Sequence, residues 1–310
     1  MKKTRDGSHG LNSQVLSAFL SKYSMGTRET FTYALRKVSE GLGFGGDIES
    51  TDWSSVNARG LHDLVEHWSE KGLAVTTIEL YMNSFKALAR ELYSWRLISA
   101  DQITDFRRIR PMRGRYNMQG KWKVVERRVR TALLKAASED PRPQGVRDAA
   151  LIAVLFGSGL KRTEAVQLRV ENVHLEQGTL TLNSIQGSIT TLHLAEWALP
   201  YLCAWMNFRS ARDLPSEGPF FCRIRKGGDL TGTALTGRGV HFICTQVSKL
   251  AGLEMPVRPQ DARMTVGATI IAEHGVLVGR KALRLSTLNR ALCYDQRSEA
   301  DVGEIIRKSQ

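Results

Sequence analysis

Apolar residues recur every three or four positions over 13–92, which is the spacing of one buried face of an α-helix. Glycines within 41–46 and at Gly72 break this pattern into separate helices. Helix follows helix with short breaks, and alternating strand-like segments are missing from this part of the chain. We therefore expect an all-α domain over 13–106, preceded by a flexible start at 1–12.

The second half of the chain combines two periodicities. The segments with helical spacing are 126–137, 147–156, 199–208 and 240–250. Alternation with period two over 178–182 and 190–194 indicates a β-hairpin, and 219–223 has the pattern of a short strand. We expect a domain over 123–310 that is helical with a small hairpin or sheet, which makes the whole chain mainly α with an α+β second domain.

Composition places the chain among globular proteins that bind a polyanion. Its 310 residues suffice for two domains, and 42% of them are apolar. The formal net charge is +13 and the isoelectric point is near 9.8. Such an excess favours nucleic acid as the partner, and double-stranded DNA is the partner we expect. The alternative is a basic protein that needs no polyanion.

The positive charge is densest between the two expected domains, over 107–122 and just beyond. The basic residues here are Arg107, Arg108, Arg110, Arg113, Arg115, Lys121, Lys123, Arg127 and Arg128. Pro111 and Gly114 disfavour a helix through the middle of this stretch. We interpret 107–122 as a linker that lies on DNA phosphates, which predicts steeply salt-dependent binding. The alternative is a solvated linker that its own charge keeps extended.

Cysteine usage and the N-terminus argue against several other classes. None of the four cysteines forms a Cys-x-x-Cys pair, so neither a zinc site nor a disulfide framework is indicated. The charged start leads into no long apolar run, so we expect no signal peptide and no membrane span. We expect buried, reduced thiols in a cytosolic protein.

Two short segments carry candidate chemistry. The first is Gly157-Ser158-Gly159-Leu160-Lys161-Arg162-Thr163-Glu164, where a small-residue turn follows an apolar run. A basic residue after such a turn can reach a phosphate, and Glu164 can support it from one helical turn further on. The plainer alternative is a helix start with a solvated Lys-Arg pair. The second segment is Arg258-Pro259-Gln260-Asp261-Ala262-Arg263-Met264-Thr265.

These segments, in this order, resemble the tyrosine recombinase (phage integrase) family. The first is similar to the family's Gly-Leu-Arg-x-Ser-Glu-Leu, and the second to its Pro-His-x-x-Arg-His-Thr. The resemblance extends from about residue 13 to the C-terminus. It implies a helical core-binding domain at 13–106 and a recombinase catalytic-type domain at 123–310. In the family this second domain cuts and rejoins DNA through a phosphotyrosine without metal. The resemblance therefore implies no metal or cofactor, and a place in the bacterial cytoplasm in association with the nucleoid.

The resemblance also implies a set of candidate catalytic residues, several of which depart from the family's pattern. Lys161 stands at the first arginine position, with Arg162 one residue late, and Gln260 stands at the histidine position. Arg263 matches the second guanidinium. The family's hairpin lysine has no counterpart over 183–190.

The C-terminal end of the motif set allows two placements. With Tyr294 as the nucleophile, the family's Gly-His pair falls near Ser286 and Thr287, while Gly279-Arg280 would leave Asn289 at the tyrosine position. We prefer the first placement, so Thr287 and Tyr294 complete the candidate set. Tyr294 is then either a nucleophile or a buried helix aromatic.

The departures separate two functions. A DNA-binding protein needs the two domains and the basic linker, whereas cleavage also needs the residues that differ. We favour a catalytically impaired accessory factor that clamps duplex DNA in the recombination or integration of mobile DNA, beside an active recombinase or as an oligomer of itself. The alternatives are an active, divergent recombinase that uses Tyr294, and a recombinase-derived transcription or partition regulator.

Overall fold

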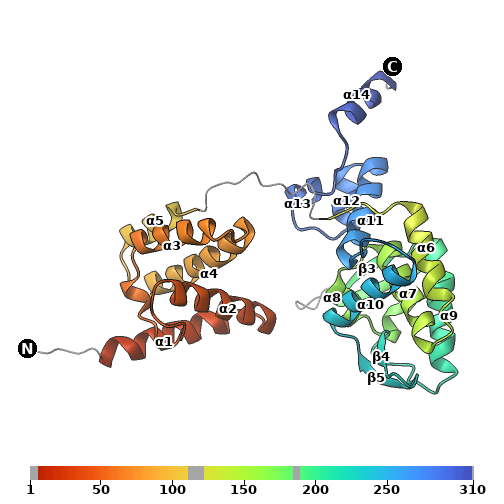
Figure 1. The fold of residues 1–310 in the computed structure, drawn as a ribbon, viewed down its shortest axis with the longest axis horizontal. Helices are drawn as coiled ribbons and strands as arrows, with labels where there is room; N and C mark the ends of the chain where they lie inside the picture. The colour runs from red at the N-terminus through yellow and green to blue at the C-terminus, as the bar shows by residue number, and fades with distance from the viewer. Residues whose placement is uncertain (1–5, 111–121, 184–188, 309–310) are drawn as a thin grey trace, which may run out of the picture. The chain divides into compact units, whose positions relative to one another are not determined.

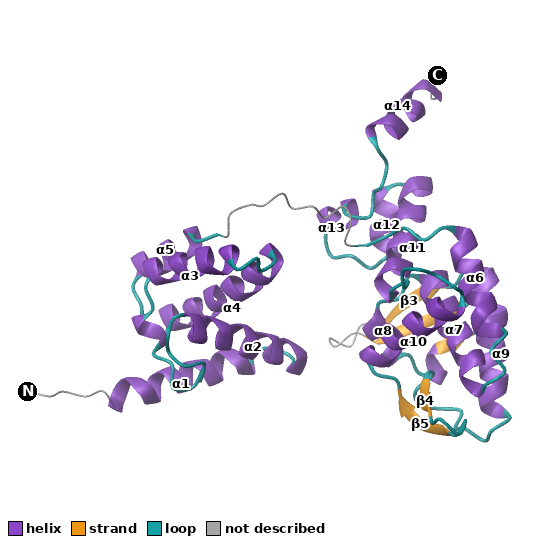
Figure 2. Ribbon diagram, in the orientation of Figure 1, coloured by secondary structure: helices purple, strands orange, loops and turns teal. Residues whose placement is uncertain are grey.

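The computed structural model describes residues 6–110, 122–183 and 189–308 and divides the chain into two compact units, 1–116 and 117–310 (Figure 1). The described residues exclude the middle of the predicted linker and the tip of the predicted hairpin. Three predicted DNA-binding residues therefore lie outside them: Arg113, Arg115 and Lys121. Figure 2 shows that helices dominate both units, with strands in the second unit. The mainly helical fold with a small sheet, predicted from the sequence, is confirmed.

The first unit is a helical bundle organised around its longest helix. Its elements are α1 (Asp6–Ser21), α2 (Met25–Gly41), the short 3-10 helix η1 (Trp53–Ser55), α3 (Ala58–Glu70), α4 (Val75–Ser94) and α5 (Ala100–Arg108). Helix α4 contacts each of the other elements because its apolar residues, among them Ile78, Phe85 and Leu92, are fully buried. Trp53 and Phe106 pack against Phe85 and close the core.

Two helix boundaries in this unit differ from the sequence expectation. Helix α1 begins at Asp6, inside the stretch 1–12 that we expected to be flexible. Near its middle the buried Asn12 donates a hydrogen bond of 3.0 Å to Asp52, which ties the helix to a distant loop. At the other end, Arg107 and Arg108 complete α5 and so belong to a helix, although we had placed them in the linker.

The second unit surrounds one buried helix. Its elements are α6 (Arg127–Ser138), α7 (Pro143–Ser158), α8 (Arg162–Gln167), η2 (Val170–Asn172), β1 (Val173–His174), β2 (Thr179–Asn183), β3 (Ile189–His193), η3 (Glu196–Ala198), α9 (Leu199–Ser210), β4 (Cys222–Ile224), β5 (Leu230–Ala234), α10 (Gly237–Leu250), α11 (Pro259–His274), α12 (Val276–Ala282), α13 (Leu288–Leu292) and α14 (Glu299–Lys308). Helix α7 is buried almost all round, and α6, α9, α10 and α11 pack against it.

The strands form two small antiparallel sheets. Strands β2 and β3 pair as the predicted hairpin, with Leu180 opposite Leu192, and β1 adds a third strand beside β2. Strands β4 and β5 form a separate pair. Both Leu180 and Leu192 are buried while their neighbours along each strand are more exposed, which is the alternation that made the hairpin predictable.

The C-terminal part of the second unit carries its own small core. Met264 and Ile271 of α11 pack with Leu283, Ala291 and Tyr294, so the turns after α12 and α13 lie against α11. This core positions the residues discussed next. None of the described helices combines the length and apolar character needed to cross a membrane.

Candidate active site

Arg263 lies at the centre of the candidate site and is almost fully buried, with 2% of its surface exposed. Its Nη1 donates to the backbone oxygen of Gly159, the left-handed residue that ends α7. Its Nη2 donates to the backbone oxygen of Leu283, in the turn after α12. One guanidinium therefore joins three segments that are far apart in the sequence, and these bonds fix its plane.

Tyr294 brings its hydroxyl to the same place. The Tyr294 oxygen lies 3.4 Å from Nε of Arg263 and 3.5 Å from Nε2 of Gln260, both of which donate toward it. Gln260 and Arg263 lie one helical turn apart on α11 and so share a face. The Tyr294 ring packs over Gly267 of the same helix, where a Cβ atom would come within 2.5 Å of the ring. The structure thus brings together three of the predicted residues.

Glu164 joins this group to Lys161. Its Oε2 accepts the Lys161 backbone N–H at 2.7 Å, and its Oε1 lies 3.5 Å from the Lys161 ammonium. Nη1 of Arg263 lies 4.0 Å from the same carboxylate. Burial alone would raise the pKa of Glu164, but the Lys161 N–H and the charge of Arg284 outweigh it, so the pKa lies below its usual range. The carboxylate is therefore ionised near neutral pH.

Lys161 is exposed and lines an open cavity of about 530 Å³, most of whose lining residues are polar or charged. The cavity lies between the start of α8, the base of the β2–β3 hairpin and Arg284. Its lining residues include Lys161, Glu164, Gln167, Arg169, Asn172 and Arg284. A charged, hydrogen-bonding cavity of this kind suits a phosphate better than an apolar ligand.

Two other predicted residues are placed differently. The Arg162 side chain lies against Gly237 at the start of α10, where its Nε would be 3.1 Å from a Cβ atom at that glycine. Thr287 is exposed and caps α13, with its Oγ1 accepting the Arg290 N–H at 3.4 Å. These local roles follow from their positions at helix starts. Within the part of the chain that the structure describes, neither residue makes a hydrogen bond or ion pair with Tyr294.

Arg284 enters the site although sequence reasoning did not select it. Its Nη2 donates to Glu164 Oε2 at 2.7 Å and its Nη1 to the Ala282 oxygen at 2.9 Å. Arg284 has a φ of 54°, in the left-handed region that glycine usually occupies. Helical periodicity ends with α12, so it gave no indication of where the Arg284 side chain points. The signal in the sequence was that a basic residue stands close to Ser286 and Thr287, where we expected the family's Gly-His pair.

The chain that enters the second unit is attached to α11. The Lys123 N–H donates to Asp261 Oδ1 at 3.1 Å, and the Val125 N–H donates to Thr265 Oγ1 at 2.8 Å. Asp261 also accepts the Arg258 N–H at 2.8 Å, which caps the helix. The end of the predicted linker is thereby held by the helix that carries Gln260 and Arg263.

The predicted DNA-binding residues that the structure describes are all exposed. They are Arg107, Arg108 and Arg110 in the first unit and Lys123, Arg127 and Arg128 in the second. Two of them make surface ion pairs, Arg108 with Asp105 at 3.6 Å and Arg128 with Glu126 at 2.7 Å. Such exposed pairs are weak and leave the cations accessible to phosphate.

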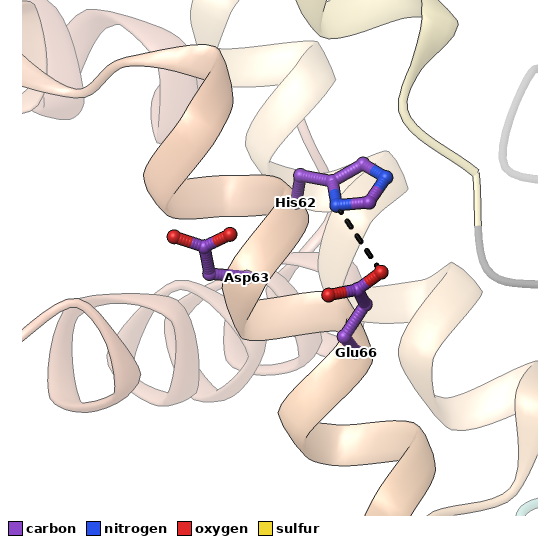
Figure 3. A group of neighbouring side chains, drawn as sticks. All are labelled: His62, Asp63 and Glu66. Atoms are coloured by element: carbon purple, nitrogen blue, oxygen red, sulfur yellow. Dashed lines mark ion pairs between the residues drawn. The ribbon is translucent and has the colours of Figure 1, made fainter.

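One group of potential metal ligands occurs among the described residues, and it belongs to the first unit. His62, Asp63 and Glu66 lie on α3 with ligand atoms within 4.8 Å of one another. Figure 3 shows Asp63 directed away from the His62–Glu66 ion pair, whose atoms are 3.6 Å apart. All three side chains are exposed, and a solvated pair at helical spacing accounts for the group.

Comparison with known proteins identifies the family. Residues 123–278, about half of the chain, match the model described as the Phage integrase family. The chain therefore belongs to the phage integrase family, as the motifs indicated.

Individual relatives are more distant. Tyrosine recombinase XerD of Listeria innocua is 27% identical over 143 residues, which is 46% of either chain. Tyrosine recombinase XerC of Yersinia pestis is 21% identical over 248 residues, covering 80% of this chain and 77% of the relative. The chain thus matches about half the length of the XerD relatives.

Solved structures share the fold. The XerH site-specific recombinase bound to palindromic difH substrate superposes with a TM-score of 0.69 at 16% identity, covering 91% of this chain and 80% of that one. The Tn1549 transposon integrase in complex with transposon right end DNA gives 0.67 at 13% identity, covering 96% and 99%.

Proposed function

We propose that this protein binds duplex DNA in site-specific recombination or the integration of mobile DNA, and that its capacity to cut DNA is impaired. The observation that carries this proposal is the composition of the site around Tyr294. Arg263 is in place, but Lys161 and Gln260 stand where the family has arginine and histidine. The site keeps the groups that hold a phosphate and lacks groups that promote its cleavage.

The charges of the site favour an anion. Lys161, Arg263 and Arg284 surround one carboxylate, Glu164, within 4.0 Å. Three cations against one anion leave an excess positive charge beside the cavity, and a phosphodiester group would compensate it. Exposed basic residues at both ends of the linker add sequence-independent attraction to the DNA backbone.

Cleavage of DNA requires groups in the same site that phosphate binding does not require. Lysine is a point charge without the planar fork that fits a phosphate bidentately. The amide of Gln260 donates hydrogen bonds but does not transfer a proton at neutral pH. The sequence over 183–190 contains no lysine to act as general acid. One lost oxyanion-type donor costs roughly 100- to 1000-fold in rate, and a lost general acid about 100- to 10,000-fold, although such losses are not additive.

Complexes of related proteins support the partners we propose. XerH was solved bound to difH substrate, and a lambda integrase tetramer was solved bound to a Holliday junction. By analogy, we propose duplex DNA as the ligand of this chain and either an active recombinase or further copies of this chain as its protein partner.

A second candidate function is an active recombinase, and the 3.4 Å approach of Tyr294 to Arg263 favours it. In that reaction the Tyr294 hydroxyl would release its proton to solvent, and its oxygen would bond to phosphorus as the bond from phosphorus to the 5′ oxygen breaks. The 5′ oxygen would then need a proton, which is the step that Gln260 does not support.

A nicked suicide duplex tests the proposal. The probe is the duplex that this protein selects from a random 30-base-pair pool, nicked near the centre so that a cleaved strand is lost. We expect binding without a covalent adduct, also when an active recombinase of the family is added. A protein–DNA adduct that disappears in Tyr294→Phe would overturn the impaired-cleavage proposal and establish the second candidate.

A further inference from the structure

We propose that Arg284 is a phosphate-binding residue and supplies the guanidinium that Lys161 does not. This inference rests on the proposed function, because the phosphate is that of the bound DNA. Three observations on the described residues carry it: the position of Arg284 beside Lys161, the hydrogen bonds that its side chain makes and leaves unmade, and its backbone conformation.

Arg284 and Lys161 share one carboxylate. Glu164 Oε2 accepts from Nη2 of Arg284 at 2.7 Å, and Glu164 Oε1 lies 3.5 Å from the Lys161 ammonium. Both cations line the same cavity. A phosphate bound by Lys161 in this cavity would therefore lie beside Arg284, and Glu164 contacts both cations at the cavity wall.

Arg263 is less free to play this part than Arg284. Both terminal nitrogens of Arg263 donate to backbone oxygens, at Gly159 and Leu283, and its Nε approaches Tyr294. Arg284 uses its terminal nitrogens on Glu164 and Ala282, but its buried Nε has no hydrogen-bond partner among the described residues. A buried N–H without a partner is costly, and a phosphate oxygen would satisfy it.

The backbone at Arg284 supports a role for the side chain. With a φ of 54°, this position suits glycine, and a large side chain adopts it at a cost. Such strain concentrates at functional positions. Burial also lowers the pKa of the Arg284 guanidinium against the opposing effect of Glu164, so a further anion beside it would stabilise its charge.

The variant Arg284→Gly separates a binding role from a structural one. Glycine relieves the left-handed backbone, which offsets the loss of the ion pair with Glu164, so we expect a melting temperature close to that of the parent. Binding to the selected duplex, measured across a salt series, should weaken about 10- to 100-fold. The slope of log affinity against log salt should fall by about 0.9, the contribution of one phosphate contact. Lys281→Ala, which removes the same charge from an exposed position on α12, should change both quantities less.

A second variant returns a guanidinium to the cavity from the other side. Lys161→Arg in the Arg284→Gly background should recover most of the lost affinity and slope, because the planar fork is restored beside Glu164. If Arg284→Gly melts at a lower temperature than the parent, Arg284→Lys distinguishes a binding role from a structural one. Lysine keeps the positive charge and the ion pair with Glu164, so the salt slope of DNA binding should persist while the affinity for the duplex falls.

The inference is overturned if the parent binds the duplex and Arg284→Gly binds it with unchanged affinity and slope, or if affinity is unchanged in Arg284→Lys. A parent that selects no duplex from the pool overturns the proposed function itself, and the inference with it. Failure of the proposed function is thus seen with the parent protein, whereas failure of the inference about Arg284 is seen with the variants of a parent that binds.

Discussion

The hydroxyl oxygen of Tyr294 lies 3.4 Å from Nε of Arg263, although α12 and α13 separate the two residues in the chain. Arg263 reaches this position because its terminal nitrogens are held by Gly159 and Leu283. The pairing places the candidate nucleophile, Tyr294, beside a buried guanidinium. It also makes the fold of the C-terminal segment depend on α11, which leads to the first prediction.

Gly267→Ala should destabilise the second unit and displace Tyr294. A Cβ atom at this position would come within 2.5 Å of the Tyr294 ring and 2.6 Å of the Leu283 side chain. Overpacking of this kind costs about 1–3 kcal/mol in the free energy of unfolding, which urea denaturation would measure. Gly303→Ala is the matched control, since nothing lies within 4 Å of a Cβ atom there. Equal midpoints for the two variants would contradict the packing described.

Asp148 should make stability fall with rising pH between about pH 4 and 6. Burial raises the pKa of Asp148 to about 6, even though Arg147 lies 2.7 Å away and opposes the shift. The folded chain then keeps a proton that the unfolded chain, with a pKa of 3.8, has released. The free energy of unfolding therefore decreases through this window, by about 2–3 kcal/mol at most.

Asp148→Asn should flatten that decrease, as followed by urea denaturation at several pH values. Asp140→Asn is an informative control because the hydrogen bond from Arg142 lowers the pKa of Asp140. The stabilising effect of that hydrogen bond is present above the ordinary pKa of aspartate and is lost as the pH falls through the lowered pKa of Asp140. A parent and an Asp148→Asn variant with the same pH profile would rule out this role for Asp148.

The basic stretch that runs from the end of α5 into the linker should contribute several phosphate contacts. Replacing Arg108, Arg110, Arg113 and Arg115 by alanine should weaken DNA binding and reduce the salt slope by up to about four contacts. Replacing the same four by lysine keeps the charge and should keep most of the slope. A slope that is unchanged in the alanine variant would mean that the linker does not touch phosphate.

Removal of 298–310 should alter assembly more than folding. No residue of α14 is buried, and Val302 and Ile306 on this helix are 46% and 63% exposed. We expect the melting temperature of the truncated protein to stay close to that of the parent, because little apolar area is lost from the core. Complexes with more than one copy on DNA, seen by native electrophoresis, should decrease. Unchanged complexes would exclude α14 from the interface between copies.

Local patterns were sufficient for much of the fold. The helices of the first unit, the β2–β3 hairpin and helices α6, α7, α9 and α10 follow from periodicity and turn residues that act over a few positions. The motif around Gly159 and Glu164 was also visible, because a left-handed glycine between helices is a local feature. Gln260 and Arg263 share a helical face for the same reason.

Tertiary packing placed the rest. Helix α1 includes residues that we expected to be flexible, and its buried Asn12 bonds to Asp52, far along the chain. Arg162 turns to α10, Thr287 caps α13, and Arg284 reaches Glu164 from the turn after α12. Hydrophobic periodicity does not predict where a side chain points after the chain reverses, because its direction there depends on what the turn packs against. The family and its two candidate motifs were therefore evident from the amino-acid order, whereas the cations that surround Glu164 were set by the packing of α7, α11 and the C-terminal turns.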